Sequence, residues 1–252
     1  MRIDLNADVG ESFGPWPMGD DARLIPLVTS INVACGFHAG DPLTIERTVK
    51  LAVRHGIVVG AHPGYPDLAG FGRRDMEMPP QELEAAVLYQ VAAVAGFARA
   101  AGTELRHVKP HGALYNRAAR DAAVAEPVAR AVARVSTALV LVGPPGSVLL
   151  DAGVAVGLPT AAEAFADRAY EPDGSLRSRS LPGALLTDSE AVAHQALTIA
   201  RDGRVTALDG STIRLRADTI CLHGDTPGAV RHARAVRAAL EAAGVEIRAF
   251  GR

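Results

Sequence analysis

Histidines and acidic residues recur at one kind of place along this chain, directly after short apolar runs. His62 and His111 each lie next to a proline, and two further histidines lie close to glycine. Carboxylate and imidazole groups transfer protons, orient water and bind divalent metal ions. The pattern predicts an active site assembled from distant segments. Its candidate members are Asn6, Asp8, Glu11, His38, His62, His111, Glu163, Asp167, His223 and Asp225.

Lys109 and two arginines add positive charge to this set. Of the 26 basic residues, 24 are arginine, so a lysine directly after an apolar run is unusual here. An ammonium group directs its charge at one point, whereas a guanidinium group is broad and forked. We therefore expect Lys109 to stabilise one developing negative charge. We expect Arg168 and Arg179, in a polar stretch, to clamp a carboxylate or phosphate.

Apolar runs alternate with amphipathic segments along the whole chain. Runs of four to six apolar residues are typical of strands buried on both faces, as in a parallel sheet. Residues 42–55, 80–101 and 229–243 have helical periodicity and end before a glycine, and Asp41 is a candidate N-cap for the first. The predicted strands span residues 3–8, 31–35, 57–61, 105–109, 138–142, 154–158 and 219–222, with a candidate eighth at 245–250.

This alternation predicts an α/β fold, and we favour a TIM-like barrel of seven or eight parallel strands over a doubly wound sheet. In a barrel the carboxyl ends of the strands meet at one rim, so the polar residues above would face one cavity. Residues 205–215 form two alternating runs around Asp209 and Gly210, which predicts a β-hairpin excursion. We see no interdomain linker and expect one domain over residues 1–252.

The composition excludes several classes of protein. Apolar residues make up 48% of the 252 residues, which excludes wholesale disorder. The formal charge is −2 and no basic run exceeds two residues, so we expect no nucleic-acid-binding face. There is no run of about 18 apolar residues, no signal peptide, and too few cysteines for a disulfide framework. We expect a soluble cytoplasmic protein that binds no membrane.

Local motifs for nucleotides and metals are absent from the sequence. It contains no phosphate-binding loop, dinucleotide fingerprint, nucleophile elbow or local zinc motif. A barrel can still assemble ligands from distant strands. A divalent metal site made of Asp8, His62 and either His38 or His111 is therefore an alternative to acid–base chemistry by the same residues.

The segments that carry these residues resemble the LamB/YcsF family, in family order over almost the whole chain. The resemblance implies a (β/α)7 barrel of the glycoside hydrolase/deacetylase type, with the eighth strand outside the ring. It also implies ATP-dependent hydrolysis of 5-oxo-L-proline to L-glutamate, carried out together with partner subunits B and C. The matching stretches are residues 4–11, 32–42, 60–67, 70–74, 108–116, 163–170 and 221–225.

Opening a five-membered lactam makes demands that these residues meet. Phosphorylation of the carbonyl oxygen would turn a resonance-stabilised amide into an imidate-like electrophile. The site then needs a base for water, an acid for the ring nitrogen and cations for developing charge. We hypothesise that Asp8 or Glu11 is the base, that His62 and His111 exchange protons, and that Lys109 stabilises charge. The substrate-binding set is Asn6, His38, Glu163, Asp167, Arg168, Arg179, His223 and Asp225.

Two alternatives compete with this hypothesis. One is a metal-dependent deacetylase or carbohydrate hydrolase on the same barrel. The other is a subunit that binds 5-oxoproline without catalysing its hydrolysis. Because the chain lacks a nucleotide motif, we expect ATP to be handled with the partner subunits.

Overall fold

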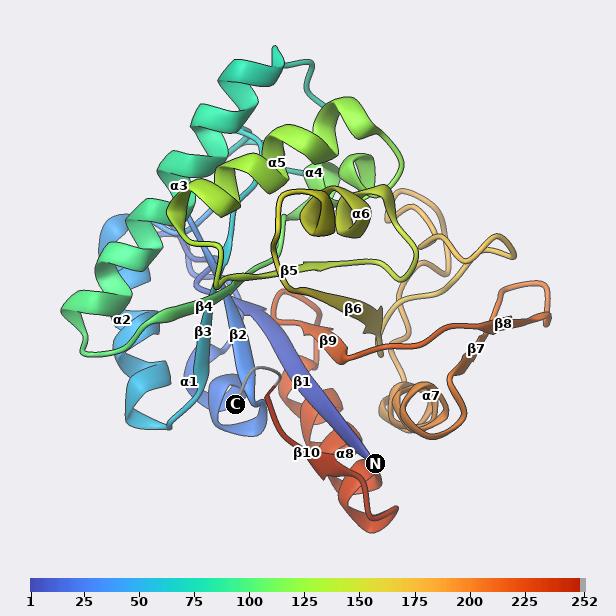
Figure 1. Ribbon diagram of the computed structural model, residues 1–252. Helices are drawn as coiled ribbons and strands as arrows, with labels where there is room; N and C mark the ends of the chain where they lie inside the picture. The colour runs from blue at the N-terminus through green and yellow to red at the C-terminus, as the bar shows by residue number, and fades with distance from the viewer. Residues whose placement is uncertain (250–252) are drawn as a thin grey trace.

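Seven parallel strands close into a barrel with helices around it (Figure 1). The computed structural model describes residues 1–249, so Phe250, at the end of the predicted eighth strand, lies outside the described residues. Neighbouring strands pair in chain order, and the last pairs with the first, with Asp8 opposite His223. The predicted barrel is confirmed. Its strands are β1 (Arg2–Val9), β2 (Ser30–Ala34), β3 (Val58–His62), β4 (Leu105–Val108), β5 (Val140–Gly143), β6 (Thr160–Phe165) and β9 (Thr219–His223).

A short eighth strand adds to this sheet without entering the ring. β10 (Glu246–Ile247) pairs in parallel with Arg2 and Ile3, before the residues at which β1 joins β2 and β9. The ring therefore has seven strands, as the family resemblance implies.

The predicted strand at residues 154–158 is wrong. These residues belong to the end of α6 (Val148–Ala155) and the turn that follows it, and the sixth strand begins at Thr160. Ser147 caps α6, and Gly157 turns the chain with a φ of 81°. A short apolar run without alternation fits a buried helix as well as a strand. The sixth strand, β6, is rich in alanine, a residue that is depleted in strands, so its sequence does not indicate a strand.

Amphipathic helices cover the outside of the barrel. Helices α2 (Pro42–Arg54), α3 (Pro80–Ala100) and α8 (Ala229–Ala242) confirm the predicted ones. Asp41 caps α2 by accepting hydrogen bonds from two backbone N–H groups. Among residues 1–249, α3 is the one helix whose length and composition alone would suit a membrane span; it packs against α5, β3 and β4. The other helices are α1 (Asp21–Leu24), η1 (Ile25–Leu27), α4 (Gly112–Ala118), α5 (Ala122–Val135) and α7 (Ser189–Asp202).

The predicted hairpin is also confirmed. β7 (Arg204–Thr206) and β8 (Thr212–Arg214) pair antiparallel, outside the barrel sheet. Asp209 stabilises the turn by accepting a hydrogen bond from the backbone N–H of Ser211. In Figure 1 the hairpin projects away from the ring, between α7 and β9.

Polar side chains of the first strand, β1, lie inside the barrel and form a hydrogen-bond network below the site. Asp4, Asn6 and Asp8 alternate along β1 with apolar residues, and all three are buried. The Asn6 amide donates hydrogen bonds to Glu163 (3.0 Å) and to the Thr219 hydroxyl (2.6 Å). This network joins β1 to β6 and β9 and places Asp8 at the carboxyl end of the barrel.

A glycine makes room for a second part of this interior network. A Cβ atom at Gly60 would lie 2.0 Å from His107 Nε2, so only glycine leaves space for the imidazole ring. His107 Nε2 lies 2.8 Å from Asn32 Oδ1, and the Asn32 amide donates to Asp8 Oδ1 at 2.8 Å. The orientation of Asp8 is thus set from below by buried hydrogen bonds.

Candidate active site

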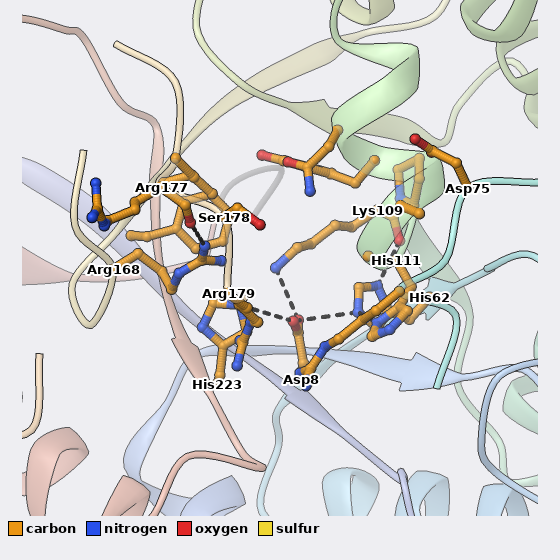
Figure 2. A pocket seen from close by; sticks show the side chains of 18 of the residues that line it. Asp8, His62, Asp75, Lys109, His111, Arg168, Arg177, Ser178, Arg179 and His223 are labelled. Carbon is orange, nitrogen blue, oxygen red and sulfur yellow. Dashed lines mark hydrogen bonds and ion pairs between the residues drawn. The ribbon is translucent and has the colours of Figure 1, made fainter. Parts of the chain in front are cut away.

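A cavity of about 590 Å³ opens at the carboxyl ends of the barrel strands (Figure 2). The four residues on which the single-cavity prediction depended, His62, Lys109, His111 and His223, all line it. Figure 2 shows Lys109 and His62 pointing toward the Asp8 carboxylate. The prediction that these distant segments meet around one space is therefore confirmed. The rest of the lining includes Arg73, Asp75, Tyr115, Asn116, Arg120, Phe165, Arg168, Arg177, Ser178 and Arg179.

Lys109 is a buried positive charge held between two carboxylates. Its Nζ lies 2.9 Å from Asp8 Oδ1, 2.9 Å from Glu163 Oε1 and 3.0 Å from Cys221 Sγ. Burial alone would lower the pKa of Lys109, but Asp8, Cys221 and Glu163 hold this pKa well above its usual value. A thiol is a weak acceptor, so the N–H directed at Cys221 is the one most readily offered to a substrate oxygen.

The tautomers of His62 and His111 follow from their hydrogen bonds to backbone. His62 Nδ1 lies 2.7 Å from the carbonyl oxygen of Lys109, and His111 Nε2 lies 2.8 Å from that of Phe71. A carbonyl oxygen only accepts hydrogen bonds, so both of these ring nitrogens carry hydrogen. In neutral rings, His62 Nε2 and His111 Nδ1 would then both carry lone pairs.

Those two nitrogens face each other at 3.1 Å. Two lone pairs at this distance repel, so the contact requires one positive charge, either a proton that makes one ring an imidazolium or a metal ion. Asp8 Oδ2 lies 3.3 Å from His62 Nε2 and favours that charge. Burial would raise the pKa of Asp8, but His62 and Lys109 hold this pKa well below its usual value, so Asp8 is a carboxylate.

His38 and Glu11 lie behind His111 and shape its environment. The rings of His38 and His111 stack with centroids 3.8 Å apart and an interplanar angle of 4°. Burial, and in second place the neighbouring histidines, lowers the pKa of both rings well below the usual value. Glu11 Oε1 lies 3.8 Å from His111 Nδ1, and burial, Asp225 and Asp8 raise the pKa of this carboxyl well above its usual value. The raised pKa favours the protonated form of the Glu11 carboxyl.

His223 and Asp167 form a second oriented pair on the other side of Asp8. Asp167 accepts hydrogen bonds from His223 Nδ1 (2.9 Å) and from the His223 backbone N–H (3.1 Å). The His223 ring stacks on Phe165 with centroids 5.4 Å apart. With Nδ1–H directed at a carboxylate, a neutral ring carries its lone pair on Nε2, which lies 3.9 Å from Asp8 Oδ2. A carboxylate that fixes the tautomer of a histidine is an arrangement suited to accepting a proton from water.

Arginines at the rim differ in what they contact. Arg168 is buried, and its guanidinium donates to the carbonyl oxygens of Ala184 and Arg177, so it stabilises the loop that follows β6. Asp225 Oδ2 lies 2.6 Å from Arg73 Nη2 and 3.6 Å from Arg179 Nη1. Asp225 thus positions two guanidinium groups at the cavity rim.

The predicted site residues divide into lining and supporting groups. Those that line the cavity are Asp8, His62, Lys109, His111, Arg168, Arg179 and His223. Those that contact the lining residues from behind or beside them are Glu11, His38, Glu163, Asp167 and Asp225. Asn6 lies one step further from the cavity and donates a hydrogen bond to Glu163.

Sequence reasoning missed several residues of the lining. Arg73 belongs to the stretch 70–74 and Asn116 to the stretch 108–116, both quoted for the family resemblance, so the motifs pointed at them. Arg120 lies beyond any such stretch and carries no sequence signal. Tyr115 and Phe165 also lie within quoted stretches, 108–116 and 163–170, but were not named as site residues.

Three groups of side chains are candidates for a metal ion. In the group Asp8, Cys221 and His223, the Lys109 ammonium already occupies the space between Asp8 and Cys221, so the group does not fit a metal. In the group Glu11, His38 and His111, the parallel stacked rings cannot both direct in-plane lone pairs at one ion.

The predicted set of Asp8, His62 and His111 does fit in its donor chemistry. The two facing imidazole nitrogens carry lone pairs, and a carboxylate oxygen lies next to them. These are the nitrogen and oxygen ligands that zinc takes in catalytic sites.

Comparison with known proteins gives one consistent result. The A subunit of 5-oxoprolinase from Chloroflexus aggregans is 58% identical over 248 residues, which is 98% of this chain and 98% of that protein. The A subunit of 5-oxoprolinase from Methylococcus capsulatus is 56% identical over 249 residues, covering 99% of this chain and 96% of that protein. The crystal structure of a lactam utilization protein from Thermus thermophilus superposes with a TM-score of 0.94 at 51% identity, covering 99% of this chain and 100% of that chain.

The family model that matches is described as the LamB/YcsF family and covers residues 3–252. This match agrees with the motifs, with the seven-stranded barrel and with the relatives just described. The chain therefore belongs to the LamB/YcsF family.

Proposed function

We propose that this chain is one subunit of an ATP-dependent 5-oxoprolinase and opens the lactam ring of 5-oxo-L-proline to give L-glutamate. The observation that carries the proposal is one cavity lined by a fixed ammonium, Lys109, and by three histidines with defined tautomers. These groups supply the cation and the proton donors and acceptors that water needs to open an amide without a nucleophilic side chain. Relatives of more than half identity carry the matching name over nearly their whole length.

The chemistry divides into an activation and two additions of water. Transfer of the γ-phosphoryl group of ATP to the lactam carbonyl oxygen releases ADP and makes the ring carbon electrophilic. A first water adds to that carbon, the carbon–nitrogen bond breaks, and the ring nitrogen takes a proton. A second water releases phosphate from the resulting acyl phosphate and leaves L-glutamate. Each step after activation needs a base, an acid and a cation.

We assign the cation to Lys109 and the base to His223. The Lys109 ammonium lies on the cavity wall and can turn from Cys221 to an oxygen that gains charge at the reacting carbon. His223 Nε2 takes the proton of the attacking water, and Asp167 stabilises the imidazolium that forms. Asp8 anchors the charges of Lys109 and His62, and Glu11 is the alternative base.

We assign the acid to the His62–His111 pair. One proton shared between the facing nitrogens relieves the repulsion of their lone pairs, and Asp8 stabilises the resulting charge. The pair delivers this proton to the departing ring nitrogen. The two facing nitrogens then both carry lone pairs, and the pair takes up a new proton. His38 packs against His111 and keeps its ring in place.

Arginines at the rim are suited to the anionic groups of the substrate. Arg179 and Arg73, aligned by Asp225, face a cavity much larger than one lactam ring, and both line it. We assign them to the substrate carboxylate and the transferred phosphoryl group. Arg168 holds the loop that carries Arg179, Glu163 pairs with Lys109, and Asn6 holds Glu163 in place.

The partners follow from this division of labour. Because the sequence has no phosphate-binding loop, we assign activation by ATP to partner subunits, named B and C in the family resemblance, and ring opening to this chain. Because the proposed reaction consumes ATP, we propose that it takes place in the cytoplasm.

The test reconstitutes the chain with its partner subunits and follows glutamate released from 5-oxo-L-proline. The proposal predicts glutamate only when this chain is present, and transfer of labelled phosphate from ATP to the lactam by the partners alone. If no activated lactam forms without this chain, the division of labour is wrong. If Lys109→Ala and Asp8→Asn weaken substrate binding and turnover equally, the chain binds the substrate but does not catalyse its hydrolysis.

A metal-dependent hydrolase is the second candidate, because Asp8, His62 and His111 offer fitting donors. An ion there would lower the pKa of a bound water and polarise a carbonyl oxygen. Elemental analysis of the purified chain decides between the two. One zinc per chain, lost in His62→Gln, would favour a metal site, whereas a metal-free and active assembly favours the shared proton.

A further inference from the structure

A second cavity of about 870 Å³ lies at the opposite end of the barrel. The first residues of β1 and β6 and the last turn of α7 line it, together with residues 214–218, which lead from the hairpin to β9. Because the barrel strands are parallel, their amino ends open here and their carboxyl ends open at the active-site mouth. The amino-end cavity is therefore separate from the candidate active site.

Positive charge dominates the amino-end cavity. Arg248 lies 3.7 Å from Glu246, but within residues 1–249 the other arginines of the lining have no carboxylate within 4.0 Å. Their side chains are exposed on separate elements. Four guanidinium groups around one hollow, none of them paired with a carboxylate of the described residues, produce a field that attracts anions. The four arginines are Arg2, Arg201, Arg214 and Arg216.

The acidic residues of this lining offset the four arginines only in part, because each has another partner and, among the described residues, none lies within 4.0 Å of those guanidinium groups. Asp4 is buried and accepts hydrogen bonds from three hydroxyl groups. Asp202 lies 3.2 Å from Arg204, on the neighbouring strand β7. Asp218 accepts a hydrogen bond from the backbone N–H of Ala162 at 2.9 Å. The positive charge of the cavity is therefore available to a ligand from outside.

The kind of ligand follows from how these groups are exposed. Small-molecule sites bring a few polar groups together in a largely apolar, enclosed pocket, but here the guanidinium groups are exposed and spread over several elements. Apolar surface lies among them, since Met1 is 68% exposed and Leu215 is half-buried. Mixed apolar and charged surface of this kind is typical of contact with another polypeptide.

We propose that the amino-end cavity docks a carboxylate-rich segment of another subunit of the 5-oxoprolinase. The proposal rests on the proposed function, because relatives named as the A subunit of an enzyme imply that other subunits exist. Docking at this end leaves the active-site mouth open to the substrate. It also gives a role to the β7–β8 hairpin, which carries Arg214 and leads directly into Arg216.

The test reverses charge in the cavity and measures binding of the partner subunits. Arg214→Glu with Arg216→Glu should weaken the Kd for the partners by about 30-fold or more, with a smaller dependence on salt than the wild type. The matched control is Arg47→Glu with Arg234→Glu, which makes the same charge change at two exposed positions on α2 and α8. The control should change Kd by less than about threefold. In the glutamate assay, the partner concentration for half-maximal rate should rise with an unchanged plateau.

Three results would contradict either the docking proposal or the proposed function on which it rests, and each can be told from the others. If the wild type forms glutamate with its partners and the Arg214/Arg216 variant binds them equally well, the docking proposal is wrong. If inorganic phosphate binds saturably at this cavity, is lost in the variant, and partner binding is unchanged, the cavity is a small-anion site. If the wild type forms no glutamate with its partners, the proposed function fails first. Circular dichroism of the variants checks that they fold.

Discussion

Removal of the Lys109 ammonium has a predictable cost in stability and in turnover. Lys109→Met keeps the apolar stem but leaves Asp8 and Glu163 buried without their counter-charge at 2.9 Å. Removing one partner of a buried ion pair costs about 3–5 kcal/mol. The entropy of unfolding is about 2.1 cal/mol/K per residue, taken over 252 residues. A loss of about 4 kcal/mol divided by this entropy gives a fall in Tm of about 8 °C. Loss of the cation at the reacting carbon should lower kcat by about 10²–10³-fold.

The chain supplies its own control for this experiment. Lys50 is the one other lysine, and its pair with Glu46 at 2.6 Å is exposed, so Lys50→Met should cost about 0.5 kcal/mol or less. Adding Glu163→Gln to Lys109→Met removes one uncompensated carboxylate. The double variant should regain part of the lost Tm but none of the lost turnover.

The assays are thermal unfolding of the purified chain and glutamate formation by the reconstituted enzyme. A Tm for Lys109→Met within about 2 °C of the wild type would mean that the buried ion pairs are not as the structure has them. A kcat near the wild-type value would refute the role of Lys109 in charge stabilisation, whatever the stability.

Three further predictions test other parts of the account. Asp167→Asn should lower kcat by about 10²–10⁴-fold with little change in KM, because an amide no longer fixes the Nδ1–H tautomer of His223; a KM effect alone would contradict this. Burial raises the pKa of Asp4 to about 6, from 3.8. A group with a raised folded-state pKa contributes stability below pH 3.8 and loses it as the pH rises through 6. Relative to Asp4→Asn, the unfolding free energy of the wild type should therefore fall by about 3 kcal/mol between about pH 3.5 and pH 7. A difference between the two proteins that stays constant with pH in chemical denaturation would contradict this. Gly60→Ala should lower the Tm sharply or prevent folding, because the new Cβ would overlap the His107 ring; a soluble variant of wild-type Tm would show that the barrel interior is wrongly packed.

The residues at the rim of the site were predictable because the ends of buried strands can be recognised in the local sequence. His62, Lys109 and His111 follow apolar runs whose length and composition indicate buried strands, and parallel strands bring their ends together. The same reasoning failed at the sixth strand, where alanines gave little strand character and the preceding apolar run belonged to α6. Glu163 was consequently expected after the strand, whereas it lies within β6 and points at Lys109.

Side-chain partners were not predictable, because they depend on closure of the ring. Asn6 and His38 were expected to bind substrate, but Asn6 contacts Glu163 inside the barrel and His38 stacks on His111. The pairing of Asp167 with His223 joins residues 56 positions apart in the chain. No local spacing encodes such contacts, which form only when the parallel strands assemble and the ring closes through the β6–β9 and β1–β9 pairings.

The central claim is that the substrate is opened in the cavity between Lys109, the His62–His111 pair and His223. The most direct test is a crystal structure of the chain with 5-oxo-L-proline bound. The account predicts the lactam carbonyl oxygen within hydrogen-bonding distance of Lys109 Nζ and the ring nitrogen turned toward His62 and His111. A lactam bound outside this cavity, or bound there with its carboxylate on Lys109 and its carbonyl facing solvent, would contradict it.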